Sequence, residues 1–321
     1  MSYVFGIDGG GTKTICLLMD DNQQVLGRGE AGPSNYQTLG IESAKQSIQF
    51  AIEQAVISAN IKTDSHLNIE AICLGLAGVG RPKDREIMQF LVQNLQLTNS
   101  LPVTRSFKPR NIVISSDSAI ALVGGTGYPV GIAVISGTGS IVYGQNRQGT
   151  TKRVGGWGYV LGDEGSGYDI AIRGLQAALR CYDGREDYTT LAENFQVNLG
   201  LNSLEELVEV VYRRGWGVKE IAGLASIVDR TAAEGDRVAD EIINGAVSEL
   251  ILATKTAISG LFSQTEEFEI ALIGGVWDGK ANCRSRFEVA ISAIAPNATV
   301  ISPRHEPAFG AGLLALNSLK G

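Results

Sequence analysis

The sequence has almost none of the side chains from which histidine-centred or cysteine-based sites are built. It contains two histidines, His66 and His305, and four cysteines that lie far apart without a CxxC or Cys/His spacing. These counts argue against a catalytic triad with a histidine base, a zinc site or a disulfide framework. The chemistry must therefore depend on carboxylates, hydroxyls and backbone amides.

Long apolar runs and basic clusters are also missing. No apolar stretch approaches the roughly 20 residues that span a bilayer, and the first residues lack the basic start of a signal peptide. The net charge is −7, which disfavours nucleic acid as the main partner. We therefore expect a cytoplasmic protein with no membrane span and no nucleic-acid partner.

The chain is long enough for two ordinary cores, with 321 residues of which 44% are apolar. Periodicity predicts strands at 3–7, 15–20, 25–30, 69–76 and 111–115, and helices at 41–60 and 83–95. Residues 165 to about 262 are largely helical in character. Mixed α/β segments then return at 268–273, 287–295 and 299–301, before a last helix at 307–319. This order favours a mostly parallel sheet with helices on its faces.

One segment of the sequence is repeated. Residues 5–22 read FGIDGGGTKTICLLMDDN and residues 131–148 read GIAVISGTGSIVYGQNRQ, so strand, glycine turn and strand recur in order. The alignment places Asp8 on Ser136, Gly9 on Gly137, Gly11 on Gly139 and Thr12 on Ser140. Two unrelated glycine hairpins are the alternative, but the flanking patterns also agree. We therefore predict a duplicated domain.

Each glycine turn is followed by a strand, which separates this pattern from two common phosphate loops. A dinucleotide fingerprint needs a helix directly after the turn, and a Walker A loop needs GxxxxGK(S/T) before a helix. Neither pattern occurs here. Both turns are predicted to be tips of β-hairpins whose amides and hydroxyls can face phosphate oxygens. Two such hairpins in duplicated domains would hold a polyphosphate from opposite sides of a cleft.

Six motifs occur in an order that resembles one family. They are DGGGTKT from residue 8, SSDSA at 115–119, SGTGS at 136–140, GGWG at 155–158, GDEGSGY at 162–168 and IGGVW at 273–277. Together they resemble the N-acetylglucosamine kinases of the BadF/BadG-type branch of the sugar kinase, Hsp70 and actin superfamily. The resemblance implies an α/β protein with two duplicated actin-like (ribonuclease H-like) domains around an interdomain cleft. The expected domains are residues 1–117, against which the helix 305–321 packs back, and residues 118–304 with a helical insertion.

The resemblance also implies an ATP-dependent kinase for the 6-hydroxyl of N-acetylglucosamine, with Mg²⁺ as second cofactor and a homodimer as the assembly. Phosphoryl transfer needs a carboxylate base, groups that hold phosphates and exclusion of water. Asp117, at the end of a predicted strand, carries over as the general base, and its alternative role is the N-cap of a helix from Ser118. Asp8 carries over as the acid that organises Mg²⁺ through water, with a turn aspartate as the alternative.

The remaining site residues follow from the same motifs. The expected ATP-binding residues are Gly9, Gly10, Gly11, Thr12, Lys13, Gly137, Thr138, Gly139, Ala222, Gly223, Gly274 and Gly275. The expected sugar-binding residues are Asn35, Asp117, Ser140, Gly156, Trp157 and Asp163, with Glu164 as a further contact. Several have structural alternatives: a solvated lysine at Lys13, a plain turn at Asn35 and at 274–275, an N-cap at Asp163 and a core aromatic at Trp157.

Three other functions stay open at this point. A few loop residues decide the sugar, so a kinase for glucosamine or another hexose is one alternative. An ATPase subunit that energises a partner protein, as in the BadF-type branch, holds an iron-sulphur cluster on paired cysteines, which the scattered cysteines disfavour. A nucleotide-binding regulator without catalysis is disfavoured by the presence of Asp117 and by the lack of a predicted DNA-binding segment before Gly11.

Overall fold

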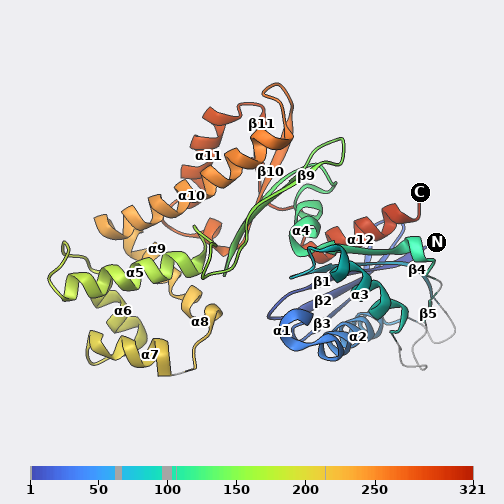
Figure 1. Ribbon diagram of the computed structural model, residues 1–321, viewed down its shortest axis with the longest axis horizontal. Helices are drawn as coiled ribbons and strands as arrows, with labels where there is room; N and C mark the ends of the chain where they lie inside the picture. Colours follow the sequence, from blue (N-terminus) through green and yellow to red (C-terminus); the bar gives the residue numbers. More distant parts are fainter. Residues whose placement is uncertain (1, 62–66, 96–102, 106, 214, 321) are drawn as a thin grey trace. The chain divides into compact units, whose positions relative to one another are not determined.

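The computed structural model describes residues 2–61, 67–95, 103–105, 107–213 and 215–320 (Figure 1). His66 lies outside these residues. The chain divides into two compact units: Met1–Val130 with Pro303–Gly321, and Gly131–Ser302. Each unit contains one β-sheet in the described part of the chain.

The sheet of the first unit has the strand order β3-β2-β1-β4-β5, with β6 also paired to β4. The strands are β1 (Tyr3–Gly9), β2 (Thr14–Asp20), β3 (Val25–Ala31), β4 (Leu67–Leu76), β5 (Val103–Arg105) and β6 (Ile112–Ser116). The first three strands are antiparallel, whereas β4 pairs parallel with β1, β5 and β6. The sheet is therefore mixed. Strand β5 escaped the sequence prediction because three residues are too few for a periodic pattern.

Helices cover both faces of this sheet. They are α1 (Tyr36–Leu39), α2 (Ile41–Ser58), α3 (Pro82–Gln93), α4 (Asp117–Thr126) and α12 (Pro307–Ser318). Side chains alternate along β1: Phe5 and Ile7 pack in the core with α2, and Val4 packs in the core with α4 and α12. Asp8 shares the parity of Val4, so it lies on the α4 and α12 side of the sheet, near the end of its strand.

The sheet of the second unit repeats this arrangement. Its strands are β7 (Gly131–Ser136), β8 (Ser140–Gln145), β9 (Thr151–Gly155), β10 (Phe268–Ile273) and β11 (Ala298–Ile301). Their order is β9-β8-β7-β10-β11, antiparallel up to β7 and parallel beyond it. This matches β3-β2-β1-β4 and its parallel neighbours. The predicted duplication of an α/β domain is confirmed.

The strand ladders correct the pairing of individual residues between the two hairpins. The last ladder pair is Gly9 with Thr14 in the first hairpin and Ser136 with Ser140 in the second. Gly9 is therefore the counterpart of Ser136, and Thr14 that of Ser140. The alignment of Asp8 with Ser136 and of Thr12 with Ser140 was wrong because the first loop is one residue longer. A shift of one residue moves a side chain to the opposite face of the sheet.

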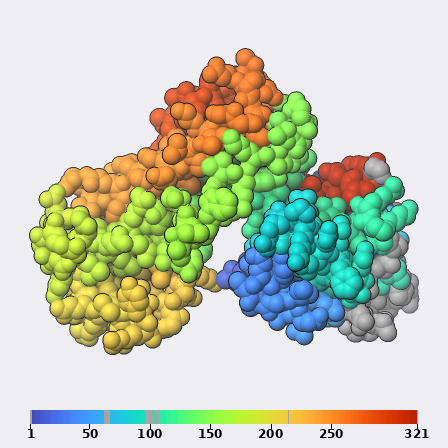
Figure 2. Space-filling view, viewed as in Figure 1, coloured from blue at the N-terminus to red at the C-terminus, as the bar shows by residue number. Residues whose placement is uncertain are grey.

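Helices fill most of the chain between β9 and β10, as predicted for residues 165 to about 262. They are α5 (Gly167–Tyr182), α6 (Leu191–Leu199), α7 (Leu207–Arg213), α8 (Val218–Gly223), α9 (Ala225–Ala233) and α10 (Arg237–Leu261), and α11 (Cys283–Ile294) follows β10. Figure 2 shows α5 to α9, yellow-green to yellow, gathered at one end of this unit and the orange segment of α11 and β11 at the other. In the described ranges, no helix is long and apolar enough to cross a membrane.

Candidate active site

Two carboxylates lie at one edge of the first sheet. Asp8 is paired with Gly75 on β4, and Gly75 is paired with Ser115 on β6, so the ends of these strands lie in one row. Asp117 follows β6 as the first residue of α4. Burial raises the pKa of Asp8 from 3.8 to about 6; the charges of Asp117 and Glu306 also raise it, and Lys13 lowers it. The two predicted acids are thus close enough for their charges to interact.

The start of α4 decides between the two roles considered for Asp117. Ser116 is the N-cap, because its hydroxyl accepts a hydrogen bond from the Ala119 amide at 3.2 Å. Asp117 lies one residue further on, and its Oδ1 accepts from the Ser118 amide at 2.7 Å. The N-cap alternative for Asp117 was therefore wrong. A carboxylate in the first turn is favoured by the positive end of the helix dipole.

The first hairpin is fixed at its base and exposed at its tip. The Gly10 amide donates to the Lys13 carbonyl at 3.0 Å, and the Ser34 amide donates to the Gly10 carbonyl at 3.0 Å. The hydroxyls of Thr14 and Ser34 are hydrogen-bonded to each other at 2.8 Å. Gly11, Thr12 and Lys13 are exposed, so their amides and side chains can meet a ligand. Sequence reasoning missed Ser34, whose only signal is its place in the Gly-Pro-Ser turn.

Asn35 has a structural role beside its predicted sugar contact. Its Oδ1 accepts from the Gln37 amide at 3.1 Å and caps α1. The segment is held by two further hydrogen bonds: the Tyr36 hydroxyl donates to Asp84 at 2.5 Å, and the Gln37 side chain donates to the Gly78 carbonyl at 2.6 Å. The cap employs the amide oxygen of Asn35, so the Nδ2 group is the donor that would serve a sugar hydroxyl.

The second hairpin is seated on the start of α5. The Gly167 amide donates to the Gly137 carbonyl at 2.7 Å, and the Tyr168 amide donates to the Thr138 carbonyl at 3.4 Å. The hydroxyl of Ser140 donates to the Glu164 carbonyl at 2.7 Å, and that of Ser136 to the Gly165 carbonyl at 2.7 Å. Because the Ser140 hydroxyl donates its proton to this loop, its oxygen can still accept a hydrogen bond from a ligand.

The IGGVW turn lies beside this hairpin. Gly274 has φ of 109°, and a Cβ there would stand 2.2 Å from the Ser136 carbonyl oxygen. The Trp277 indole anchors the turn by donating to the Val134 carbonyl at 3.1 Å. Gly275 begins a short 3₁₀ helix and has open space at its Cβ position. The structural alternative of a tight turn is therefore present, and the turn also places an accessible backbone next to the hairpin.

Ala222 completes this side of the second unit. A Cβ on Gly167 would stand 2.9 Å from the Gly137 carbonyl oxygen and 3.2 Å from the Ala222 carbonyl oxygen. The structure thus brings together three segments predicted to bind ATP: the hairpin at Gly137, the end of α8 at Ala222, and Gly274. Gly223, next to Ala222, is exposed.

Asp163, in the loop before α5, lies against the same hairpin. Its Oδ2 would be 2.6 Å from a Cβ on Gly139, and its Oδ1 accepts from the Gly158 amide at 3.1 Å. Burial raises the pKa of Asp163, whereas the hydrogen bond from Gly158 lowers it. The N-cap of α5 is Ser166, whose hydroxyl accepts from the Asp169 amide, so the N-cap alternative for Asp163 was wrong.

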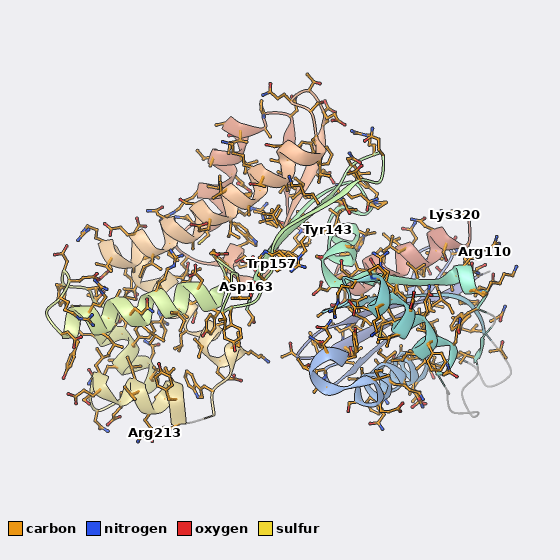
Figure 3. All side chains as sticks on the ribbon, viewed as in Figure 1. Arg110, Tyr143, Trp157, Asp163, Arg213 and Lys320 are labelled. Atoms are coloured by element: carbon orange, nitrogen blue, oxygen red, sulfur yellow. The ribbon has the colours of Figure 1, made fainter. Side chains whose placement is uncertain are left out.

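Trp157 is an exposed side chain of the loop between β9 and α5. It is 68% exposed, so the core alternative was wrong. Figure 3 shows Trp157 and Asp163 in the same region of this loop. Gly156, which precedes Trp157, has φ of 70° and carries a carbonyl that accepts a hydrogen bond from Arg153. Sequence reasoning missed Arg153, although it is the last cation before a run of 19 residues without lysine or arginine.

The carboxylates of Asp8 and Asp117 suit a divalent cation whose other ligands are water and phosphate oxygens. Among the described residues, no three His, Cys, Asp or Glu side chains are grouped to hold a metal ion. Asp8 and Asp117 offer hard carboxylate oxygens, and their mutual repulsion is of the kind that a cation relieves. Mg²⁺ typically takes one or two carboxylates together with water and phosphate oxygens. Asp8 therefore fits a magnesium site that is completed by a nucleotide.

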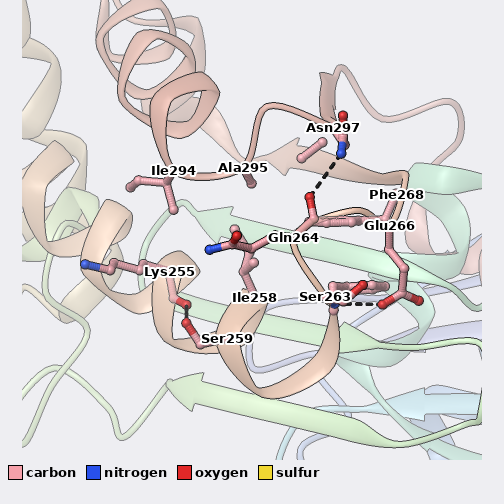
Figure 4. A pocket seen from close by; sticks show the side chains of 12 residues that line it. Lys255, Ile258, Ser259, Ser263, Gln264, Glu266, Phe268, Ile294, Ala295 and Asn297 are labelled. Carbon is pink, nitrogen blue, oxygen red and sulfur yellow. Dashed lines mark hydrogen bonds between the residues drawn. The ribbon is translucent and has the colours of Figure 1, made fainter.

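One pocket of the second unit lies away from these residues. It has a volume of about 170 Å³ and lies between the end of α10 and the start of β10 and β11 (Figure 4). Two hydrogen bonds link residues that line it: the Asn297 side chain donates to the Gln264 carbonyl at 3.0 Å, and the Ser263 amide donates to Glu266 at 2.7 Å. None of the predicted site residues lines it.

Comparison with known proteins supports the resemblance seen in the sequence. The model of the BadF/BadG/BcrA/BcrD ATPase family matches residues 5–315. The chain belongs to this family. An N-acetylmuramic acid/N-acetylglucosamine kinase of Clostridium acetobutylicum is 35% identical, and an N-acetyl-D-glucosamine kinase of Dictyostelium discoideum is 33% identical; each alignment covers 98% of both chains.

The fold agrees with that assignment to the BadF/BadG/BcrA/BcrD family. A solved structure of a protein from Chromobacterium violaceum matches with a TM-score of 0.75 and 26% identity over 98% of each chain. The predicted fold class and family are confirmed. ATP is the nucleotide expected of a member of this ATPase family.

Proposed function

We propose that the protein is an ATP-dependent kinase that converts N-acetylglucosamine to N-acetylglucosamine 6-phosphate. The observation that carries this proposal is the position of Asp117, in the first turn of α4 and beside the partly buried Asp8. A base and a cation-organising acid at the carboxyl edge of one sheet are what phosphoryl transfer to an alcohol requires. Two full-length relatives are named as kinases of this sugar.

Asp117 acts as the general base in this proposal. Its carboxylate orients the sugar 6-hydroxyl and accepts the proton as the hydroxyl oxygen forms a bond to the γ-phosphorus of ATP. The bond between that phosphorus and the bridging oxygen breaks, and its electron pair leaves with ADP. The hydrogen bond from the Ser118 amide to Oδ1 fixes the orientation of the carboxyl group.

The other roles follow the geometry of each unit. In the first unit, Asp8 would hold Mg²⁺ through water, Asn35 would contact the sugar, and the segment Gly9–Lys13 would contact phosphates. A bound Mg²⁺ would neutralise charge on the transferred phosphate. In the second unit, the nucleotide would contact Gly137, Thr138, Gly139, Ala222, Gly223, Gly274 and Gly275, and the sugar would contact Ser140, Gly156, Trp157 and Asp163.

The assembly and the location belong to the same proposal. We expect a homodimer in the cytoplasm, and two domains at residues 1–117 with 305–321 and at residues 118–304. Size-exclusion chromatography with light scattering tests the dimer: a mass near 34 kDa, that of one chain, would contradict it. Limited proteolysis followed by mass spectrometry tests the domain boundaries, because cleavage concentrates where few contacts cross.

N-acetylmuramic acid is a second candidate substrate. The relative from Clostridium acetobutylicum, at 35% identity over 98% of both chains, is named for both sugars. N-acetylmuramic acid has the same 2-acetamido ring and free 6-hydroxyl as N-acetylglucosamine, and differs by a lactyl ether on O3. The same base would therefore serve both substrates.

A sugar panel tests the proposed function. ADP release would be measured with magnesium and ATP in the presence of N-acetylglucosamine, N-acetylmuramic acid, glucosamine, glucose, N-acetylmannosamine or no sugar. We expect rapid release with N-acetylglucosamine and only background release without sugar. Faster release with glucosamine or glucose would reassign the substrate. Release that no sugar changes would instead indicate an ATPase that acts on a partner protein.

A further inference from the structure

Arg153 carries a positive charge into the loop that holds the expected sugar contacts. It lies on β9, and its guanidinium group is 4.9 Å from the centre of the Trp157 ring. It also donates a hydrogen bond to the Gly156 carbonyl. Its charge lowers the pKa of Asp163, so it lies within electrostatic range of that carboxylate. Arg153 therefore adjoins three residues expected to bind sugar.

The segment that follows Arg153 is acidic. Between Arg153 and Arg173 the sequence has no lysine or arginine, but it has Asp163, Glu164 and Asp169. Arg173 is paired with Asp169 at 2.8 Å. Within the described ranges, Arg153 has no carboxylate within the 4.0 Å of an ion pair. Its charge is thus not neutralised by a direct ion pair in this part of the protein.

The guanidinium group is suited to receive a carboxylate. It has five N–H donors in a planar fork, and stacking over an aromatic ring restricts its orientation. The hydrogen bond to Gly156 employs Nη2 and leaves other donors for a ligand. Two parallel N–H···O bonds to a carboxylate are stronger and more specific than bonds to a neutral hydroxyl. N-acetylglucosamine has no group of this kind.

We propose that Arg153 binds the lactyl carboxylate of N-acetylmuramic acid, so that one site accepts an acidic as well as a neutral N-acetylated amino sugar. This inference rests on the proposed kinase function. An ionised substrate would otherwise approach Asp163 and Glu164, and the repulsion between like charges would oppose binding. Arg153 is thereby a specificity-determining residue, and the carboxylate on O3 is the group that it recognises.

A purely structural role for Arg153 makes a different prediction. If the side chain only supports the Trp157 loop, its removal weakens both sugars to the same extent. If it binds the lactyl carboxylate, its removal changes the ratio between the sugars. Salt also separates the two roles, since screening weakens an ion pair with a solvent-accessible substrate and leaves a neutral sugar little affected.

The test compares kcat/KM for the two sugars in the wild type, Arg153→Gln, Arg153→Lys and the control Arg147→Gln. Arg147 is an exposed arginine of the β8–β9 turn that pairs with Glu266 at 3.5 Å. We expect Arg153→Gln to lower the ratio of N-acetylmuramic acid to N-acetylglucosamine at least tenfold, mainly through KM. Arg153→Lys should recover part of the loss, and Arg147→Gln should leave the ratio unchanged.

Three results would overturn the inference. The first is an unchanged ratio in Arg153→Gln. The second is a wild-type KM for N-acetylmuramic acid that does not rise between low and high salt, a measurement that needs no variant. The third is a wild type that phosphorylates N-acetylglucosamine but not N-acetylmuramic acid; the proposed function then stands without this inference. Turnover of neither sugar would reject both.

Discussion

The two glycine hairpins have the same topology and different chemistry. In the first unit, Asp8 precedes the last ladder residue of β1, and the equivalent position on β7 is Ile135. The first hairpin thus has a carboxylate next to its loop, where the second has an apolar side chain. The second hairpin instead donates its Ser136 and Ser140 hydroxyls to the loop before α5. The two units therefore share the strand topology of the hairpin, and the side chains that differ between them determine which groups each hairpin can bind.

The segments that follow the hairpins differ as well. After β3 the first unit continues within a short turn to α1 and α2. After β9 the second unit has the exposed loop with Trp157, and then the helices α5 to α9. The first unit therefore holds the acid pair on a compact frame, whereas the second presents loops and helix ends around its hairpin. Substitutions in the two units should consequently affect different steps.

The largest effect is expected in the first unit, at Asp117. Asp117→Asn keeps the size of the side chain and removes the base, and general-base catalysis contributes roughly 10²- to 10⁴-fold. Turnover should fall by at least about a hundredfold, while calorimetry still detects sugar binding. Asp21→Asn, at an exposed turn, is the matched control. Turnover above about a tenth of the wild-type rate would reject Asp117 as the base.

The second prediction concerns the stability cost of Asp8. The folded protein holds the Asp8 proton up to about pH 6, whereas an unfolded aspartate releases it near 3.8. The folded state binds more protons in this window, so the free energy of unfolding falls as pH rises through it. Without magnesium, Asp8→Asn should be more stable than the wild type by up to about 3 kcal/mol at about pH 8.

Urea unfolding at two pH values measures this effect. The difference between Asp8→Asn and the wild type should shrink to near zero at about pH 4, where the wild-type carboxyl is protonated in the folded state. Asp21→Asn controls for the loss of a surface charge in the same unit. Equal free energies of unfolding for Asp8→Asn and the wild type at about pH 8 would contradict this prediction, because ionised Asp8 would then not destabilise the folded state.

The third prediction moves to the second unit and uses two neighbouring glycines. A Cβ at Gly274 would clash with the Ser136 carbonyl and require a positive φ, whereas Gly275 has open space. Gly274→Ala should therefore lower the free energy of unfolding by about 1–3 kcal/mol and raise KM for ATP more than KM for the sugar. Gly275→Ala should change stability little. Equal stability losses in both variants would contradict the described turn.

The smallest effect is expected at Asn35, where structure and binding can be separated. Asn35→Asp retains an oxygen for the cap of α1 and loses the Nδ2 donor, so stability should hold while KM for the sugar rises. Asn35→Ala loses both groups and should also cost about 1 kcal/mol of stability. Thermal unfolding and steady-state kinetics measure the two effects. An unchanged sugar KM in Asn35→Asp would limit Asn35 to its role as a cap.

Much of this structure could be predicted from the sequence. The long apolar strands, the amphipathic helices and the two glycine hairpins are periodic or repeated patterns, and these specify elements and their order. The motif set also identified the family. The sequence could not show which residues of the two hairpins correspond. The first loop has one extra residue, so the glycines of the two hairpins can be aligned in two registers.

The sequence also did not determine which residues cap the helices or whether the Trp157 side chain is exposed. Ser116 and Asp117 are adjacent, and Asp163 and Ser166 are three positions apart. Serine and aspartate have similar preference for the N-cap, so propensity alone does not choose between the members of each pair. The exposure of Trp157 depends on the loop that carries it, and a large aromatic residue between glycines is compatible with either surface or core. Arg153 belongs to none of the motifs, and only the structure shows that it lies beside Trp157 and Gly156.

The most direct test of the central claim is the position of the phosphate in the product. The protein would be incubated with magnesium, ATP and N-acetylglucosamine, and the product analysed by proton–phosphorus correlation NMR. The account predicts one sugar phosphate whose phosphorus couples to the two protons on C6. A phosphorus coupled to the anomeric proton, or inorganic phosphate with unmodified sugar, would contradict it.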